Sequence, residues 1–217
     1  MTEQVQSQQQ GPLPVVVFAD FVCPYSFIAQ EQVDQLMREY DVNVMWKPYW
    51  LHPEVPVEGK VMEGGDPERR RAHQAWLKEM APVMAARMKS PGKLQFSFFA
   101  FEAMEFAEER GKALPFKTAV FDALWVEGKD IALVSTLQEA GAKAGLDAEE
   151  LGRALHDRTY TQRAAEAVVA ARDLGIHQTP TMILGRTKIV GWHYYEVMQT
   201  VLEKQGIQPR SSQTPSA

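Results

Sequence analysis

The chain has 217 residues, of which 45% are hydrophobic and 24% charged, and its formal net charge is −5. This length suits one domain, or one domain with a large insertion, and the apolar fraction is sufficient for a buried core. The negative net charge argues against a nucleic-acid partner, because phosphate binding needs clustered Lys and Arg. No apolar stretch reaches the roughly 20 residues of a membrane span, so we expect no membrane insertion.

The sequence contains a single cysteine, Cys23. One cysteine cannot form an internal disulfide, which is typical of proteins in a reducing compartment. Residues 1–14 are polar and Gln-rich, and they lack the cationic start and apolar core of a secretory signal. We therefore expect a cytoplasmic protein in which residues 1–13 and 208–217 form disordered tails.

The first block of the chain predicts a βαβ unit. Residues 15–19 form a continuous apolar run, which is typical of a strand buried on both faces. Pro24 suits the first position of a helix, which apolar residues at positions 33, 36, 37 and 40 extend along one face. The alternating residues 42–46 then predict a second strand.

The second block, residues 66–175, predicts an all-helical insertion, with helices at 67–89, 97–110, 114–127, 131–145, 148–156 and 160–174. The chain then returns to strands at 181–184 and 188–190, joined by a short turn that contains Gly185, and ends in a helix at 194–205. This order predicts an α/β thioredoxin-like fold. Residues 14–65 and 176–207 would form the thioredoxin-like domain, interrupted by the insertion.

Cys23 opens the segment Cys23-Pro24-Tyr25-Ser26 at the predicted strand-to-helix junction. The unpaired N–H groups and the dipole of a helix N-terminus stabilise a thiolate, and the Ser26 hydroxyl could donate a hydrogen bond to the sulfur. Both features lower the thiol pKa, and the thiolate is the reactive species. We therefore predict that Cys23 is a nucleophile assisted by Ser26. The alternative is that Cys23 is a small buried apolar residue.

The segment Thr179-Pro180-Thr181 directly precedes the first strand of the third block. In a thioredoxin-type fold, this position predicts a cis-proline that faces the active cysteine, since cis bonds are costly for other residues. The backbone of Thr179 would then be free to pair with an extended substrate. The alternative is an ordinary trans-proline at the start of an edge strand.

Residues 18–28 resemble the active-site segment of the DsbA-like thioredoxin superfamily, and residues 47–59 resemble its cytoplasmic FrnE-like branch. Residues 121–131, 179–181 and 191–197 are similar to further segments of that branch. The resemblance implies a thiol–disulfide oxidoreductase that acts through Cys23, with Pro24, Tyr25, Thr179 and Pro180 at the substrate. Its partners would be disulfides and thiols of proteins or small molecules.

Ser26 departs from the dithiol members of this superfamily, which carry a second cysteine at that position. A single thiol can form a mixed disulfide but cannot release itself internally. We therefore expect an external thiol, most simply glutathione as a co-substrate, to complete the reaction. We expect no bound cofactor, and the five histidines show no spacing typical of a zinc site.

Two other functions stay open. Kappa-class glutathione transferases and 2-hydroxychromene-2-carboxylate isomerases belong to the same superfamily and have a segment that resembles Ser-Pro-Tyr-Ser, so Pro24-Tyr25-Ser26 fits them equally well. Cys23 itself and residues 48–59 favour the oxidoreductase. A non-catalytic redox-sensing or client-binding module would use the same thiolate, which oxidants or glutathione could cap.

Overall fold

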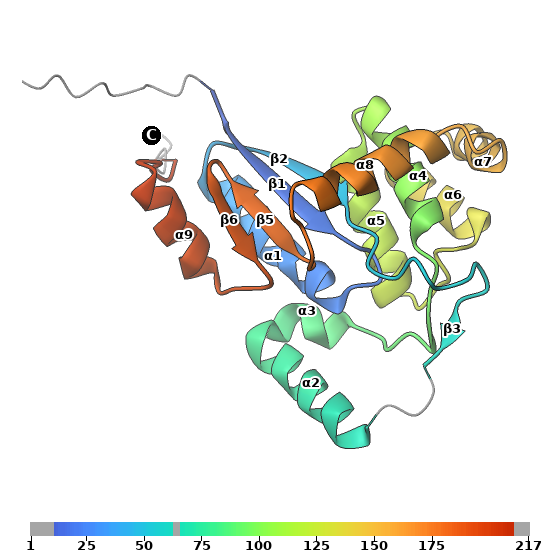
Figure 1. The fold of residues 1–217 in the computed structure, drawn as a ribbon, viewed down its shortest axis with the longest axis horizontal. Helices are drawn as coiled ribbons and strands as arrows, with labels where there is room; N and C mark the ends of the chain where they lie inside the picture. The colour runs from blue at the N-terminus through green and yellow to red at the C-terminus, as the bar shows by residue number, and fades with distance from the viewer. Residues whose placement is uncertain (1–10, 63–65, 211–217) are drawn as a thin grey trace, which may run out of the picture.

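The computed structural model describes residues 11–62 and 66–210. Its central sheet has the strand order β2-β1-β5-β6. Strand β1 (Leu13–Ala19) pairs in parallel with β2 (Val42–Pro48) and antiparallel with β5 (Thr181–Leu184), and β5 pairs antiparallel with β6 (Thr187–Val190). Helix α1 (Pro24–Glu39) connects β1 to β2, and α9 (Tyr195–Lys204) follows β6 (Figure 1). This arrangement confirms the predicted thioredoxin-like fold.

Strand β1 is covered on both faces. Val15 and Val17 belong to the large core that also contains residues of α1 and α9. Val16 and Phe18 belong to a smaller cluster with Ala171 of α8 (Thr161–Asp173). Because successive side chains of a strand point to opposite faces of a sheet, α8 covers the face opposite α1. This double cover explains the continuous apolar run in the sequence.

The helical insertion consists of α8 and four preceding helices: α4 (Phe98–Glu109), α5 (Ala113–Trp125), α6 (Val134–Lys143) and α7 (Ala148–His156). It lies at the side of the sheet away from α9 (Figure 1). Glycines follow the ends of several of these helices, and those at positions 111, 145 and 175 have positive φ, which glycine adopts without strain.

Residues 60–94 differ from the prediction in two ways. The helix expected at 67–89 is divided into α2 (Pro67–Met80) and α3 (Pro82–Arg87), because Pro82 has no N–H with which to continue the hydrogen bonds of α2. In addition, β3 (Lys60–Val61) and β4 (Lys93–Leu94) form a two-stranded antiparallel ribbon, so residues 66–175 are not helical throughout. Strands of two residues carry no periodic pattern by which a sequence could reveal them.

The predicted tails lie outside the described residues, except for residues 11–13 and 208–210. Leu13 begins β1. The Arg210 N–H donates to the Glu39 carbonyl at 2.6 Å, and its guanidinium donates to the Asp41 carboxylate at 3.1 Å. Among the helices of the described residues, none is long and apolar enough to cross a membrane.

Candidate active site

The connector between β1 and α1 places Cys23 at the N-cap of α1. The Cys23 N–H donates to the Asp20 carbonyl at 3.1 Å, and the Cys23 carbonyl accepts the Phe27 N–H at 3.1 Å. Pro24 occupies the first turn of the helix, where its missing N–H costs no hydrogen bond. The strand, connector and helix predicted around Cys23 are therefore present.

The Cys23 sulfur meets the segment that precedes β5. Its S–H donates to the Thr179 carbonyl, with a sulfur-to-oxygen distance of 3.5 Å. The Thr179–Pro180 peptide bond is cis, and both residues are buried. Two segments that lie 156 residues apart in the sequence thus meet at the sulfur.

Two hydroxyls beside the sulfur have no hydrogen-bond partner in the part of the chain that the structure describes. The Ser26 and Thr179 side-chain oxygens are buried, and neither forms a hydrogen bond with a described residue. Both side chains nevertheless favour the charged form of the sulfur and lower the pKa of Cys23. A thiol has one hydrogen, which Cys23 gives to the Thr179 carbonyl, whereas a thiolate would accept hydrogens from hydroxyls. The surroundings therefore offer different hydrogen bonds to the two protonation states.

The expected lowering of the Cys23 pKa is wrong for this conformation. Only 3% of Cys23 is exposed, and this burial raises the pKa of its thiol. Thr179 and Ser26 lower the pKa, whereas the charge of Asp20 raises it further. Loss of solvation outweighs the hydrogen bonds at the helix N-terminus, so the sulfur is held as a thiol at neutral pH.

Asp20 is a fully buried acid in the connector. Its carboxylate accepts the Val22 N–H at 3.2 Å and the Leu51 N–H at 2.8 Å, which ties the connector to the segment after β2. Burial raises the pKa of Asp20 from 3.8 to about 6, although these hydrogen bonds and one from the Ser97 side chain lower it. Asp20 thus fixes the backbone next to Cys23 and also places a negative charge near the sulfur.

The helical insertion holds the connector from the other side. Trp125 of α5 is buried, and its indole N–H donates to the Phe21 carbonyl at 2.8 Å. The Phe21 ring packs against Phe101 and Phe121, with centroid distances of 5.9 and 5.0 Å. Sequence reasoning missed Trp125, since no motif marks a tryptophan as the partner of a carbonyl 104 residues away.

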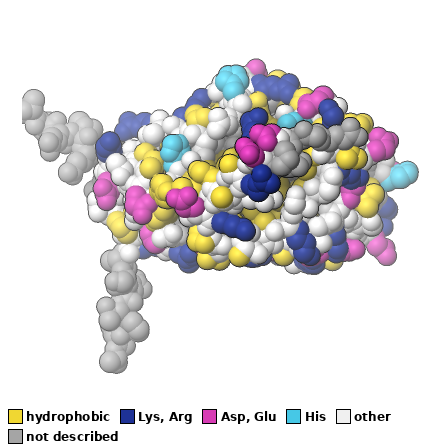
Figure 2. Space-filling model, turned by 90° about the horizontal axis from the view of Figure 1, so that it is seen from below, with side chains coloured by type: hydrophobic (Ala, Val, Ile, Leu, Met, Phe, Trp, Pro, Cys, Tyr) yellow, Lys and Arg dark blue, Asp and Glu magenta, His cyan; other side chains and the backbone are white. Residues whose placement is uncertain are grey.

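Tyr25 lies between the Cys23 sulfur and α2. Its ring centroid is 5.2 Å from that of His73 and 5.3 Å from that of Trp76. Burial and the nearby Cys23 raise the pKa of the Tyr25 phenol, whereas Arg69 lowers it. The face of the molecule that carries α2 has apolar side chains interspersed with charges of both signs (Figure 2). Tyr25 is thus a residue at the rim of the site.

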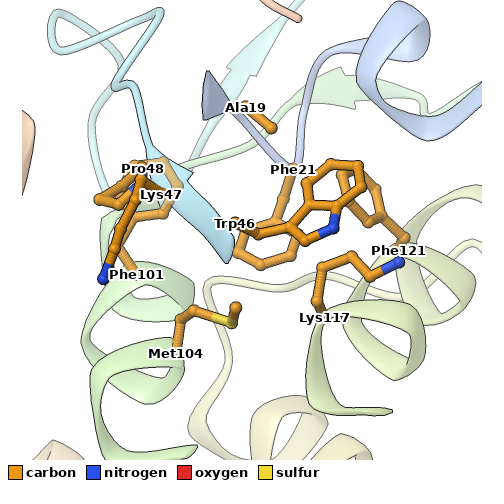
Figure 3. Close-up of a pocket in the computed structure, with 9 residues that line it drawn as sticks. All are labelled: Ala19, Phe21, Trp46, Lys47, Pro48, Phe101, Met104, Lys117 and Phe121. Carbon is orange, nitrogen blue, oxygen red and sulfur yellow. The ribbon is translucent and has the colours of Figure 1, made fainter. Parts of the chain in front are cut away.

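A cavity of about 20 Å³ lies between the end of the sheet and the insertion (Figure 3). It has room for about one water molecule, so it is too small for a substrate. Lys117 lines it and is 2% exposed; its ammonium donates to the Gln30 side chain at 2.9 Å and lies 4.6 Å from the Trp46 ring centroid. Burial lowers the pKa of Lys117 to about 8, although Asp34 and Asp122 raise it. In the sequence, Lys117 lies one helical turn before the apolar Phe121, and this spacing could have indicated that Lys117 faces the core as well.

Of the residues predicted for the site, Cys23, Thr179 and Pro180 come together in the structure, with Ser26 and Tyr25 in the first turn of the helix that Cys23 caps. Across residues 11–62 and 66–210, no group of three or more His, Cys, Asp or Glu is placed to hold a metal ion. The strongest nucleophile among these side chains is the Cys23 sulfur, and the groups around it shift its pKa.

Comparison with known proteins agrees with this architecture. Residues 14–203 match the family described as DSBA-like thioredoxin domain. The chain is 28% identical over 180 residues to the uncharacterized protein YwbO of Bacillus subtilis (strain 168), which covers 82% of this chain and 89% of the relative.

Several solved structures share this fold. The probable DsbA oxidoreductase SCO1869 from Streptomyces coelicolor has a TM-score of 0.80 at 20% identity, covering 94% of this chain and 93% of that one. A 2-hydroxychromene-2-carboxylate isomerase has a TM-score of 0.68 at 20% identity, covering 89% and 94%. The cytosolic disulfide reductase DsbM from Pseudomonas aeruginosa, solved with GSH, has a TM-score of 0.64 at 18% identity, covering 89% and 98%. With its fold, its helical insertion and the match over residues 14–203, this chain belongs to the DSBA-like thioredoxin domain family.

Proposed function

We propose that this protein is a thiol–disulfide oxidoreductase that acts through the single thiol of Cys23. The observation that carries the proposal is the surroundings of the sulfur. Cys23 is the N-cap residue of α1, its sulfur contacts the Thr179 carbonyl, and two buried hydroxyls that have no hydrogen-bond partner among the described residues can stabilise its thiolate. An inert structural cysteine needs no such groups, because a buried thiol behaves as a small apolar side chain and forms only weak hydrogen bonds.

The first step is exchange with a client disulfide. The Cys23 thiol loses its proton to solvent, and the thiolate attacks one sulfur of the client. A bond forms between Cys23 and that sulfur, the client disulfide breaks, and the second client sulfur leaves with the electron pair as a thiolate. The Ser26 and Thr179 hydroxyls stabilise the thiolate of Cys23 during this step. This role supports the proposal that Ser26 is a catalytic residue.

The client would bind alongside the segment that precedes β5. Thr179 supplies backbone groups beside the sulfur, and Pro180, which has no N–H, ends the segment without competing for the substrate's hydrogen bonds. Pro24 and Tyr25, in the first turn of α1, border the same place from the other side. We propose these four residues as the substrate-binding surface.

An external thiol completes the cycle because the chain contains no second cysteine. The thiolate of this co-substrate attacks the mixed disulfide, and Cys23 leaves as a thiolate. For a glutathionylated client, the net reaction converts the client mixed disulfide and one glutathione into the client thiol and glutathione disulfide. The DsbM structure solved with GSH and the FrnE-like resemblance of residues 47–59 support glutathione and a cytoplasmic setting.

The test uses a glutathionylated peptide with and without free glutathione. We expect the wild-type protein to release one equivalent of peptide thiol without glutathione, to gain the mass of one glutathionyl group, and to turn over when glutathione is added. Cys23→Ser should release none, and Ser26→Ala, which leaves the sulfur in place, should react more slowly.

Two outcomes would overturn this function in favour of another. Activity that survives in Cys23→Ser would favour a glutathione transferase or isomerase, in which a hydroxyl can replace the thiol. A stable mixed disulfide that glutathione does not resolve would favour a redox-sensing module, which is modified but does not turn over.

A further inference from the structure

Helix α2 contacts the thioredoxin-like part through one face. His73 and Trp76 pack on Tyr25 with centroid distances of 5.2 and 5.3 Å, and Met80 accepts the Tyr194 hydroxyl at 2.8 Å. These three residues of α2 are spaced by three and four positions, so they lie on one side of the helix. This side of α2 therefore borders the rim of the active site.

Arg69 continues the same face toward the start of the helix. It lies four residues before His73 and seven before Trp76, and its side chain is exposed. The charge of Arg69 lowers the pKa of the Tyr25 phenol, whereas the nearby Cys23 raises it. Burial lowers the pKa of His73, whereas the guanidinium of Arg69 stays charged at neutral pH. Arg69 is thus one helical turn beyond the two rings that pack on Tyr25, and Tyr25 is two residues from Cys23.

From this order we infer that Arg69, together with the Tyr25 hydroxyl, forms a subsite for a carboxylate of the thiol that resolves the Cys23 mixed disulfide. The inference rests on the proposed function and names its co-substrate class, an anionic peptide thiol. Guanidinium and carboxylate groups match in a two-hydrogen-bond geometry, and the phenol can donate a third hydrogen bond. In a tripeptide whose central residue carries the thiol, the sulfur and the terminal carboxylate are about 7 Å apart when the chain is extended. The carboxylate can therefore lie beside Tyr25, two residues from Cys23, while the sulfur meets Cys23.

The subsite takes no part in the covalent step. The co-substrate thiolate attacks, the mixed disulfide breaks, and Cys23 leaves as a thiolate, while the bound carboxylate keeps its charge throughout. Arg69 is therefore a binding residue, which raises the local concentration of anionic thiols and should discriminate against uncharged ones.

The experiment measures how fast two thiols resolve a preformed mixed disulfide between Cys23 and an uncharged peptide. Glutathione carries carboxylates, whereas 2-mercaptoethanol does not. The variants are Arg69→Gln and, as a matched control, Arg71→Gln, which removes the same charge from the same helix about 200° around its axis. Each rate constant is compared with that of the wild-type protein for the same thiol, so intrinsic differences in thiol reactivity cancel.

We expect Arg69→Gln to lower the glutathione rate constant about fivefold, the scale of one solvent-exposed ion pair, and to leave the 2-mercaptoethanol rate constant unchanged. Arg71→Gln should change neither. Equal losses in the two variants, or an equal loss with both thiols, would overturn the subsite while leaving the proposed function intact. If neither thiol resolves the wild-type mixed disulfide, the proposed function fails, and the subsite fails with it.

Discussion

The buried carboxylate of Asp20 should make the stability of the protein depend on pH in a way that one substitution removes. Burial raises the pKa of Asp20 from its ordinary 3.8 to about 6, so between these values the folded protein binds a proton that the unfolded chain has lost. Stability therefore falls as pH rises through this window. At about 1.36 kcal/mol for each pH unit, the ionised carboxylate costs the fold about 3 kcal/mol at pH 7.

Asp20→Asn removes this titration and leaves one oxygen to accept a backbone N–H. The amide cannot satisfy both the Val22 and the Leu51 N–H, so the variant loses one hydrogen bond, at a cost of about 1–3 kcal/mol that does not vary with pH. Relative to wild type, the variant should therefore gain about 2 kcal/mol of unfolding free energy between pH 4 and pH 7.

Urea denaturation followed by tryptophan fluorescence at several pH values between 4 and 7 measures this difference. Asp173→Asn, which changes an exposed carboxylate of α8, is the matched control and should follow the wild-type curve. If Asp20→Asn also runs parallel to wild type across this range, the reasoning about Asp20 is refuted.

Three further predictions follow from buried groups near the site. The rate of Cys23 alkylation by iodoacetamide should still be rising with pH at about 8.5, the pKa of a free cysteine, because burial raises the thiol pKa; a rate already constant at pH 7 would contradict this. Lys117→Met should stabilise the protein at pH 7 by up to about 3 kcal/mol, and its advantage should decline from pH 8 and vanish near pH 10.5, where the wild-type lysine is neutral in the unfolded chain as well. Trp125→Phe should cost about 1–3 kcal/mol in urea denaturation, because the Phe21 carbonyl loses its donor; no loss of stability would mean that water replaces the indole.

The order of elements could be predicted from the sequence because each has a strong local pattern. The apolar run at residues 15–19 marks β1, and Pro24 marks the start of α1. The placement of Thr179 near Cys23 depended on recognising the fold, because nothing local links residues 156 positions apart. The division of the helix at Pro82 could have been predicted from the proline alone.

The protonation state of the site could not be predicted, because it depends on burial. From sequence, Cys23 is a thiol at a helix N-terminus, and that position lowers its pKa. In the structure the connector is enclosed by α5 and by the segment after β2. The resulting loss of solvation raises the pKa of the Cys23 thiol instead. A sequence pattern describes the neighbours of a residue along the chain, whereas solvation depends on neighbours that are distant in it.

The hydrogen bond from Trp125 to Phe21 makes the insertion part of the candidate active site rather than an appendage to it. A shortened chain from which residues 98–173 were deleted would keep every strand of the central sheet but would leave the Phe21 carbonyl and ring without their partners. In such a shortened domain, the connector that carries Cys23 would lose part of what holds it in place. Insertion and sheet are therefore expected to be inherited together, as one unit.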